Sequence, residues 1–205
     1  PRPAEIWAHS NVEIRSVASI RGLRMRTAGD GGAILTRMGA SVVFLPGGEL
    51  YEAMKRGVIE AFEYSTPAVD WPMGFQEIAK YHYFSATRAP SDPLNFIVNK
   101  TAWEELSPDL KALVQEAVYA WTTRHDLNEY VASVEALKKF KAYPGAVLAH
   151  LPEDVERALL AETKKFYDEK AAAEKPIYGE ILNAMRAFLK AYGDYNALNT
   201  PYVVD

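Results

Sequence analysis

Polar and aromatic side chains suited to an organic anion stand at the ends of three short extended segments, at Arg26, Phe44 and the run Glu63-Tyr64-Ser65. They supply one guanidinium, one carboxylate, two hydroxyls and an aromatic ring. A guanidinium can bind a carboxylate through two parallel hydrogen bonds, which an ammonium group cannot match. A carboxylate beside an arginine can pair with it or can hold a hard cation. The set predicts a binding site for a small polar anion and no catalytic group.

A plainer interpretation exists for two of these residues. Arg24 and Arg26 alternate with Leu23 and Met25, so both arginines lie on one face or edge of a strand. A solvent-facing pair explains them as well as a ligand clamp does. A strand-end carboxylate such as Glu63 is equally common as a solvated cap. The pattern leaves these alternatives open.

The segments that carry these residues follow a strand–helix–strand–helix–strand order. The periodicity predicts strands over Leu23–Thr27, Ser41–Leu45 and Val58–Glu63, with helices over Gly31–Met38 and Glu49–Arg56 between them. Parallel strands joined by right-handed crossovers open their carboxyl ends on one edge of the sheet. Ligands of open α/β sheets bind at that edge. We therefore expect the site residues to meet there.

The flanking segments are less regular. Residues Val12–Arg15 are a weak candidate for a strand, and Leu94–Asn99 and Tyr81–Phe84 are stronger ones. Pro67 and Pro72 argue against a regular helix through most of residues 64–75. Trp71 in this stretch either walls a pocket or belongs to the core.

The second half of the chain predicts long helices. Ser107-Pro108-Asp109 is a strong helix start, and no glycine or proline follows until Pro144. A helix of roughly 35 residues is about 50 Å long, which suggests that it crosses two lobes. A last strand is expected over Ala146–Leu151, followed by helices over Pro152–Asp168 and Pro176–Tyr192. Trp121 and Tyr130 on the long helix suit a homodimer contact and core packing equally well.

Composition excludes several classes. The 205 residues are 49% hydrophobic and 24% charged, with a net charge of -4, so nothing favours nucleic acid as a partner. The absence of cysteine excludes disulfides and thiolate chemistry. No apolar run approaches the roughly 20 residues of a membrane-spanning helix. No signal peptide is visible and the chain starts at Pro1 without methionine, so we expect a processed or truncated product.

Two other motifs do not fit a functional site. The run Gly29-Asp30-Gly31-Gly32 lies between a strand and a helix, but it lacks the spacing of a phosphate loop and carries an acid there. The four histidines, His9, His82, His125 and His150, have no partner at metal-ligand spacing. His82, between two tyrosines, is expected on the sheet surface or as a satisfied core residue.

Three stretches in this order resemble the solute-binding proteins of tripartite ATP-independent periplasmic (TRAP) transporters, the DctP-like family. They are GLRMRTAGDGGAILTRMGASVVFLPGGELYEAMKRGVIEAFEYSTP, GFQEIAKYHY and FIVNKTAWEELSPDLKALVQEA. The Gly47-Gly48 turn and the GFQEIAKYHY run are most similar to the branch that binds 2-oxo acids and lactate. The strong part of the resemblance covers about residues 14–116.

The resemblance implies a periplasmic binding protein-like α/β fold, with parallel or mixed sheets, flanking helices and a long lobe-spanning helix. Residues of about 12–62 and 93–150 would form lobe segments with crossovers, and residues 151–205 the C-terminal helices. Members carry further residues ahead of this start, so a partial two-lobe protein lacking its N-terminal part is expected. The implied function is non-enzymatic and periplasmic: delivery of a 2-oxo or 2-hydroxy monocarboxylate to TRAP membrane permease subunits. An α/β enzyme acting on a small carboxylate and a vestigial structural fragment are the alternatives.

The resemblance also assigns site residues. The family's ligand-clamping arginine falls on Arg26, and its acidic residue and tryptophan fall on Glu63 and Tyr64, so tyrosine replaces tryptophan here. A later glutamate that helps to hold a cation has no counterpart, and Asp92 is the carboxylate available in that loop. With the strand-end residues and the aromatic residue named above, the predicted ligand set is Arg26, Phe44, Glu63, Tyr64, Ser65 and Trp71. Glu63, Tyr64 and Asp92 would hold Na⁺ or Ca²⁺, and no other cofactor is implied.

Overall fold

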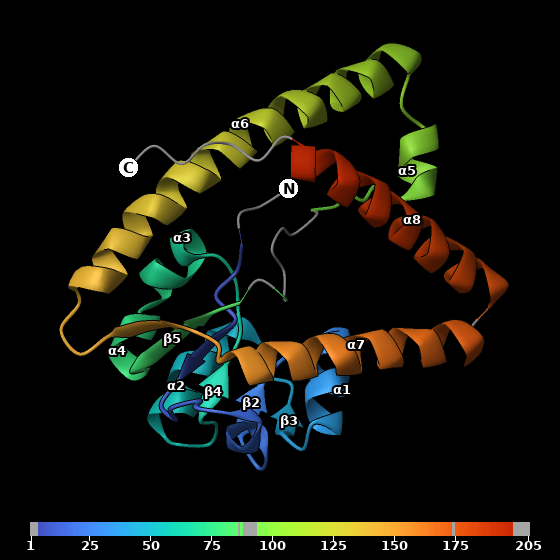
Figure 1. The fold of residues 1–205 in the computed structure, drawn as a ribbon. Coiled ribbons are helices and arrows are strands. Elements are labelled where there is room, and N and C mark those ends of the chain that lie inside the picture. The colour runs from blue at the N-terminus through green and yellow to red at the C-terminus, as the bar shows by residue number, and fades with distance from the viewer. Residues whose placement is uncertain (1–3, 86, 88–93, 174, 199–205) are drawn as a thin grey trace. The chain divides into compact units, whose positions relative to one another are not determined.

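A computed structural model describes residues 4–85, 87, 94–173 and 175–198 (Figure 1). In this part of the chain the strands form one six-stranded sheet with the order β3-β2-β4-β1-β5-β6. The strands are β1 (Ala8–Ser10), β2 (Arg24–Arg26), β3 (Ser41–Val43), β4 (Ala61–Phe62), β5 (Tyr81–Phe84) and β6 (Val147–His150).

The sheet is mixed because of a single strand. β1 runs antiparallel to both of its neighbours, β4 and β5, whereas β2 is parallel to β3 and β4, and β5 is parallel to β6. The carboxyl ends of the other five strands therefore lie at one edge of the sheet. In the register, Arg26 lies beside Val43 on one side and Phe62 on the other. The expected convergence of strand ends at this edge is confirmed for β2, β3 and β4.

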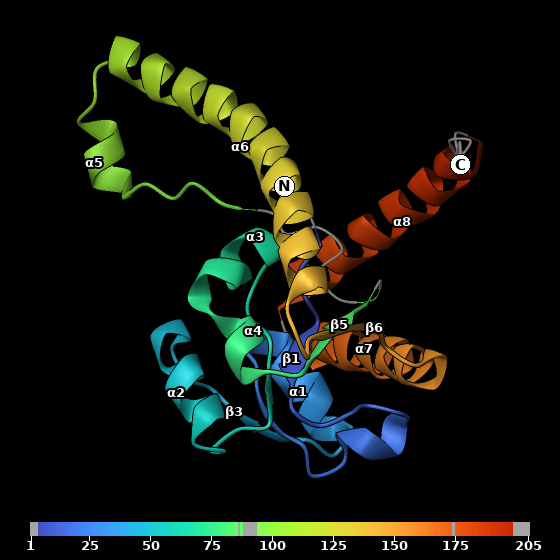
Figure 2. The same cartoon turned by 90° about the vertical axis from the view of Figure 1, so that its left-hand side faces the viewer.

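Helices connect and flank the strands (Figures 1 and 2). Short 3-10 turns occur at η1 (Val17–Ile20), η2 (Gly47–Glu49) and η3 (Trp71–Met73). The α-helices are α1 (Gly29–Arg37), α2 (Leu50–Lys55), α3 (Pro67–Asp70), α4 (Phe75–Ile78), α5 (Lys100–Glu104), α6 (Pro108–Ala142), α7 (Glu153–Ala173) and α8 (Pro176–Leu198). The long helix expected from Ser107 onward has 35 residues, as predicted.

Two strand predictions were wrong. The N-terminal strand is Ala8–Ser10 and not Val12–Arg15. β1 is buried on both faces between two neighbours, so it lacks the alternation that marks a half-buried strand. Residues 94–99 form no strand: they lie exposed, and no other described strand pairs with them. Their apolar side chains alone suggested a strand.

The segment that follows β4 is more helical than expected. Pro67 occupies the first turn of α3, and Pro72 occupies the first turn of η3. Proline is tolerated there because its missing N–H would have no partner within the helix. The two prolines therefore divide this stretch into short helical turns. Gly74, in the left-handed region with φ 76°, separates η3 from α4.

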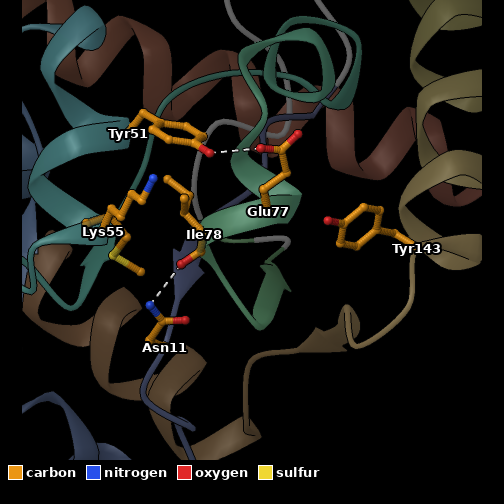
Figure 3. A pocket seen from close by; sticks show the side chains of 7 residues that line it. Asn11, Tyr51, Lys55, Glu77, Ile78 and Tyr143 are labelled. Atoms are coloured by element: carbon orange, nitrogen blue, oxygen red, sulfur yellow. Dashed lines mark hydrogen bonds between the residues drawn. The ribbon is translucent and has the colours of Figure 1, made fainter.

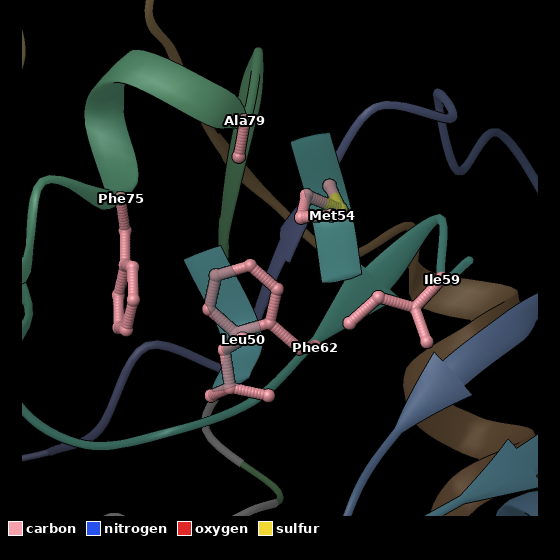
Figure 4. Packing of buried hydrophobic residues seen from close by; sticks show 6 residues of the cluster. All are labelled: Leu50, Met54, Ile59, Phe62, Phe75 and Ala79. Atoms are coloured by element: carbon pink, nitrogen blue, oxygen red, sulfur yellow. The ribbon is translucent and has the colours of Figure 1, made fainter. Parts of the chain in front are cut away.

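Apolar side chains from α2, β4 and α4 form a core cluster on one face of the sheet (Figure 4). Phe62 and Phe75 are fully buried and pack edge to face, with ring centroids 4.7 Å apart. Leu50, Met54 and Ile59 complete the packing from α2 and the approach to β4. This cluster holds the strand ends beside α2 and α4, and hence positions the segment after Phe62.

The chain divides into two compact units, residues 1–160 and 161–205. In the first, α6 packs on α3, as Figure 2 shows, and Ala136 and Phe140 in the C-terminal third of α6 are buried. In the second, the end of α7 and α8 are linked by the ion pair Arg186–Asp168 at 2.7 Å. The apolar face predicted for α8 is more than half exposed at Ile177, Ile181, Met185, Phe188 and Tyr192. The described helices include none with the length and hydropathy required to cross a membrane.

Candidate functional site

Arg26 lies at the end of β2 and is 7% exposed. Its Nε donates to the carbonyl oxygen of Leu45 at 2.9 Å, and its Nη1 donates to the carbonyl oxygen of Glu63 at 2.7 Å. The guanidinium is thus fixed between the ends of β3 and β4. Two of its three nitrogens, Nε and Nη1, are thus engaged by described residues.

Glu63 is the ionic partner of this arginine. Its Oε1 accepts from Arg26 Nη1 at 3.2 Å and from the Ala28 amide at 3.0 Å, and the side chain is 5% exposed. The sequence left open whether this carboxylate is solvated, pairs with arginine or holds a cation; the pairing with arginine is formed. The bond to Ala28 also ties the end of β4 to the turn between β2 and α1.

Phe44 covers the guanidinium from outside. Arg26 Cζ lies 5.4 Å from the centroid of the Phe44 ring, a distance at which the ring attracts the cation. The ring itself is 65% exposed. An aromatic side chain with one face on a cation and the other face accessible can cover a bound ligand.

Tyr64 and Ser65 continue from Glu63. The Tyr64 ring packs edge to face on Phe75 at 5.6 Å and passes so close to Gly47 that a Cβ there would lie 2.5 Å from its Cε2. Ser65 is buried, and its backbone bonds to Ile6 N through the carbonyl and to Asp70 Oδ2 through the amide. Both residues therefore have defined positions next to the arginine.

The ring contacts of Trp71 lie elsewhere, and the position of Asp92 is not described. Trp71, in η3, packs its ring against Phe140 at 5.1 Å and Tyr143 at 6.2 Å, so its ring contacts are with α6 and the residue that follows it. Asp92 lies outside the described residues. The cation role assigned to Glu63, Tyr64 and Asp92 remains a prediction.

A buried polar chain next to this edge was missed from the sequence. His9 Nε2 and Asp70 Oδ2 are 2.9 Å apart, and His9 Nδ1 and His82 Nδ1 are 2.8 Å apart. All three side chains are completely buried. Of the two alternatives for His82, sheet surface or satisfied core residue, the structure shows a core position in which Nδ1 has a partner and Nε2 has none among the described residues. The pairing was not visible because β1 brings together positions 73 residues apart.

Burial is the main cause of the pKa shifts of His9, His82 and Asp70. It lowers the pKa of His9 to about 3 and that of His82 to about 3, in the latter case with help from His9. It raises the pKa of Asp70 well above the usual value; the Ser65 amide opposes that rise and the charge of Glu63 adds to it. Neutral imidazoles and an easily protonated carboxyl are the result.

A separate surface pocket of about 480 Å³ lies at the opposite edge of the sheet (Figure 3). Its polar groups largely satisfy one another: Tyr51 donates to Glu77 at 2.8 Å, and Asn11 bonds to the Ile78 carbonyl and the Lys80 amide. Its cation, Lys55, is an exposed ammonium 5.8 Å from the centroid of the Tyr51 ring, and it lacks the planar fork of a guanidinium. The pocket does not replace the edge around Arg26 as the candidate site.

Comparisons with known proteins agree with this geometry. Residues 5–174 match the family described as bacterial extracellular solute-binding protein, family 7. A monocarboxylate 2-oxoacid-binding periplasmic protein of Nostoc sp. is 32% identical over 189 residues, which are 91% of this chain and 51% of that protein. The chain thus spans about half the length of this curated relative.

Solved structures similar to this chain are also periplasmic solute-binding proteins. A TRAP periplasmic solute-binding protein from Colwellia psychrerythraea with bound calcium and pyruvate is 30% identical, with a TM-score of 0.90 over 96% of this chain and 60% of that one. One from Pseudoalteromonas atlantica with bound sodium and pyruvate is 28% identical, with a TM-score of 0.81 over 98% and 62%. The expected periplasmic binding protein-like α/β class is thereby confirmed. The chain belongs to the bacterial extracellular solute-binding proteins of family 7.

Proposed function

We propose that the protein containing this chain is the extracytoplasmic solute-binding component of a TRAP transporter. It binds a 2-oxo or 2-hydroxy monocarboxylate at the sheet edge around Arg26 and delivers it to the membrane permease subunits in the periplasm. The observation that carries the proposal is the buried Arg26 guanidinium, fixed at the carboxyl end of a parallel strand with Phe44 across its face. Phe44, Glu63, Tyr64, Ser65 and Trp71 are the other proposed ligand residues.

The proposal extends to a cation and to the two-lobe arrangement. Relatives that are 28–30% identical hold pyruvate together with calcium or sodium. We assign Na⁺ or Ca²⁺ to Glu63, Tyr64 and Asp92 on this basis. Residues of about 12–62 and 93–150 belong to lobes that close over the ligand in the hinge manner of periplasmic binding proteins, with residues 151–205 as C-terminal helices.

An Arg26→Lys substitution tests the arginine. Lysine keeps the charge and loses the planar fork, so pyruvate affinity should fall roughly tenfold to a hundredfold, as expected for a charged hydrogen bond. Isothermal titration calorimetry measures the affinity, and a thermal melt reports on the fold. An unchanged dissociation constant rejects Arg26 as the clamp.

The matched control is Arg24→Lys on the same strand. Arg24 is 48% exposed and pairs with Glu60 at 3.2 Å, away from the strand end. Its replacement should leave pyruvate affinity unchanged. Turnover of pyruvate or lactate seen by NMR during the same incubations would favour the enzyme alternative, and no thermal shift across a panel of acids would favour the structural fragment.

A further inference from the structure

The buried chain Asp70–His9–His82 is bonded directly to the proposed ligand edge. At one end the Ser65 amide donates to Asp70 Oδ2 at 3.4 Å. The middle contacts are 2.9 Å and 2.8 Å long and completely buried. His82 Nε2 and Asp70 Oδ1 have no hydrogen-bond partner among the described residues. The proposed function leaves these three titratable side chains without a role.

The surroundings of the chain are mostly aromatic. Phe62 of β4, Phe75 of α4 and Phe140 of α6 place their rings 5.0 to 6.1 Å from the His9 ring. The charged groups nearby are Glu63, which acts on Asp70, and Glu129 of α6, which accepts from Thr66 Oγ1 at 2.5 Å. In so apolar a site a net charge is costly, and the charge of Asp70, His9 and His82 together is set by the number of protons that they share.

The hydrogen bonds of this chain can run in two directions. With Asp70 ionised, His9 Nε2–H donates to the carboxylate and His82 Nδ1–H donates to His9 Nδ1. With Asp70 protonated, its O–H donates to His9 Nε2, His9 Nδ1–H donates to His82 Nδ1, and His82 carries its proton on Nε2. Each imidazole is neutral in both arrangements and carries its proton on the opposite nitrogen.

One proton converts the first arrangement into the second. His82 Nε2 takes up the proton, His82 Nδ1 passes one to His9 Nδ1, and His9 Nε2 passes one to Asp70 Oδ2. An ionised carboxylate is a stronger acceptor than a carboxylic acid. The Ser65 amide is therefore held more firmly in the ionised arrangement.

We propose that Asp70 is a positioning residue for the ligand edge, and that uptake of one proton by the Asp70–His9–His82 chain loosens its bond to the Ser65 amide and weakens carboxylate binding. The ligand part of this inference rests on the proposed function. The proton step and its effect on Ser65 do not.

NMR of the ligand-free protein tests the proton step. Long-range ¹H–¹⁵N spectra distinguish the two tautomers of each histidine, and the Ser65 amide is followed in the same titration. As the pH falls, His9 should change from Nε2–H to Nδ1–H and His82 from Nδ1–H to Nε2–H, together with a shift of the Ser65 amide. The three midpoints should coincide. Separate midpoints, constant tautomers or formation of imidazolium overturn the proposal.

An Asp70→Asn variant mimics the protonated arrangement, because its amide donates to His9 Nε2 at every pH. Its histidines should stay in the Nδ1–H form at position 9 and the Nε2–H form at position 82. The exposed His150 provides the matched control, since His150→Gln should leave the exchange intact. Tautomers that still exchange in Asp70→Asn overturn the assignment. The titration of the unmodified protein stands independently if this variant fails to fold.

Calorimetry with pyruvate then tests the coupling. The unmodified protein should bind roughly fivefold more tightly above the tautomer midpoint than below it. Asp70→Asn should bind with the weaker affinity throughout, without this step. Pyruvate binding that depends on Arg26 but shows no such step overturns the inference and leaves the proposed function standing. A coincident exchange at His9, His82 and Ser65 without pyruvate binding overturns the proposed function and the ligand coupling, and leaves the proton step standing.

Discussion

At the scale of single residues, the candidate site depends on close approaches between backbone and side chain. Arg26 is oriented by two carbonyl oxygens, those of Leu45 and Glu63, rather than by its ion pair alone. Tyr64 lies where it does because Gly47 has no side chain. Such contacts cannot be read from residue types, because any residue can offer a carbonyl.

Gly47→Ala should therefore displace the Tyr64 ring. A Cβ at this position would meet Cε2 at 2.5 Å and the hydroxyl at 2.8 Å, so the ring must move. We expect a weaker pyruvate affinity, by roughly tenfold if Tyr64 contacts the ligand, and a loss of stability of about 1 kcal/mol from overpacking. Calorimetry and urea unfolding measure the two effects.

Gly48→Ala is the matched control for this variant. A Cβ at Gly48 meets nothing within 4 Å, and its backbone is not in the left-handed region. Affinity and stability should stay close to those of the unmodified protein. Equal effects at the two glycines would contradict the steric explanation.

At the scale of elements, the contact between α3 and α6 lies next to the segment that follows β4. α3 begins two residues after Ser65 and packs on α6, where Thr66 bonds to Glu129 and Phe140 lies against His9 and His82. The contact between α3 and α6 thus encloses the buried polar chain. An opening here would admit water to groups that the fold keeps dry.

Phe140→Ala should be strongly destabilising. The side chain is fully buried against His9, His82 and Trp71, so its removal leaves a cavity and should cost about 3 to 5 kcal/mol. Urea unfolding measures the change. Leu127→Ala on the same helix is the control, because Leu127 is 64% exposed and should change stability by less than about 0.5 kcal/mol. Similar losses at both positions would argue against the packing described for α6.

At the scale of the whole molecule, the buried side chains of Asp70, His9 and His82 make the stability of the fold depend on pH in two opposite ways. Folding lowers the pKa of His9 and His82 from 6.5 to about 3, so below 6.5 the unfolded state binds protons that the folded state refuses. Folding raises the pKa of Asp70 above 3.8, so the folded state retains one proton that the unfolded state has lost. The two histidines thus make stability rise with pH, and Asp70 acts in the opposite direction.

The free energy of unfolding should therefore rise with pH up to about 6.5. Above about pH 4 and well below pH 6.5, the unfolded state binds at least one more proton than the folded state, because two histidines oppose one carboxyl, so stability rises with pH by at least about 1.4 kcal/mol per unit. Near pH 6.5 the histidines of the unfolded state lose their protons and this rise ends. Urea unfolding from pH 4 to 8 measures the slope. His150→Gln should leave the curve unchanged, and a curve without this rise would show that the three side chains are not buried as described.

The sequence alone determined the local order of the fold. Alternation and helix-start signals predicted β2, α1, β3, α2, β5, the 35-residue α6 and β6, because these elements depend on residues close together in the chain. The site residues Arg26, Phe44 and Glu63 were predicted to converge because strand ends of crossover units must share an edge. The resemblance to the family rested on the same stretches.

Only the tertiary structure decided which partners these residues have. The prediction for β1 was wrong because its burial comes from two strands distant in sequence. The prediction of a strand over residues 94–99 was wrong because none of the described strands pairs with them. The packing of the Trp71 ring on Phe140 also joins segments distant in sequence, and its place in the ligand set stays a prediction. The Asp70–His9–His82 chain joins three segments that share no local pattern. Hydrogen bonds and packing between such segments depend on three-dimensional distance, which residue spacing does not encode.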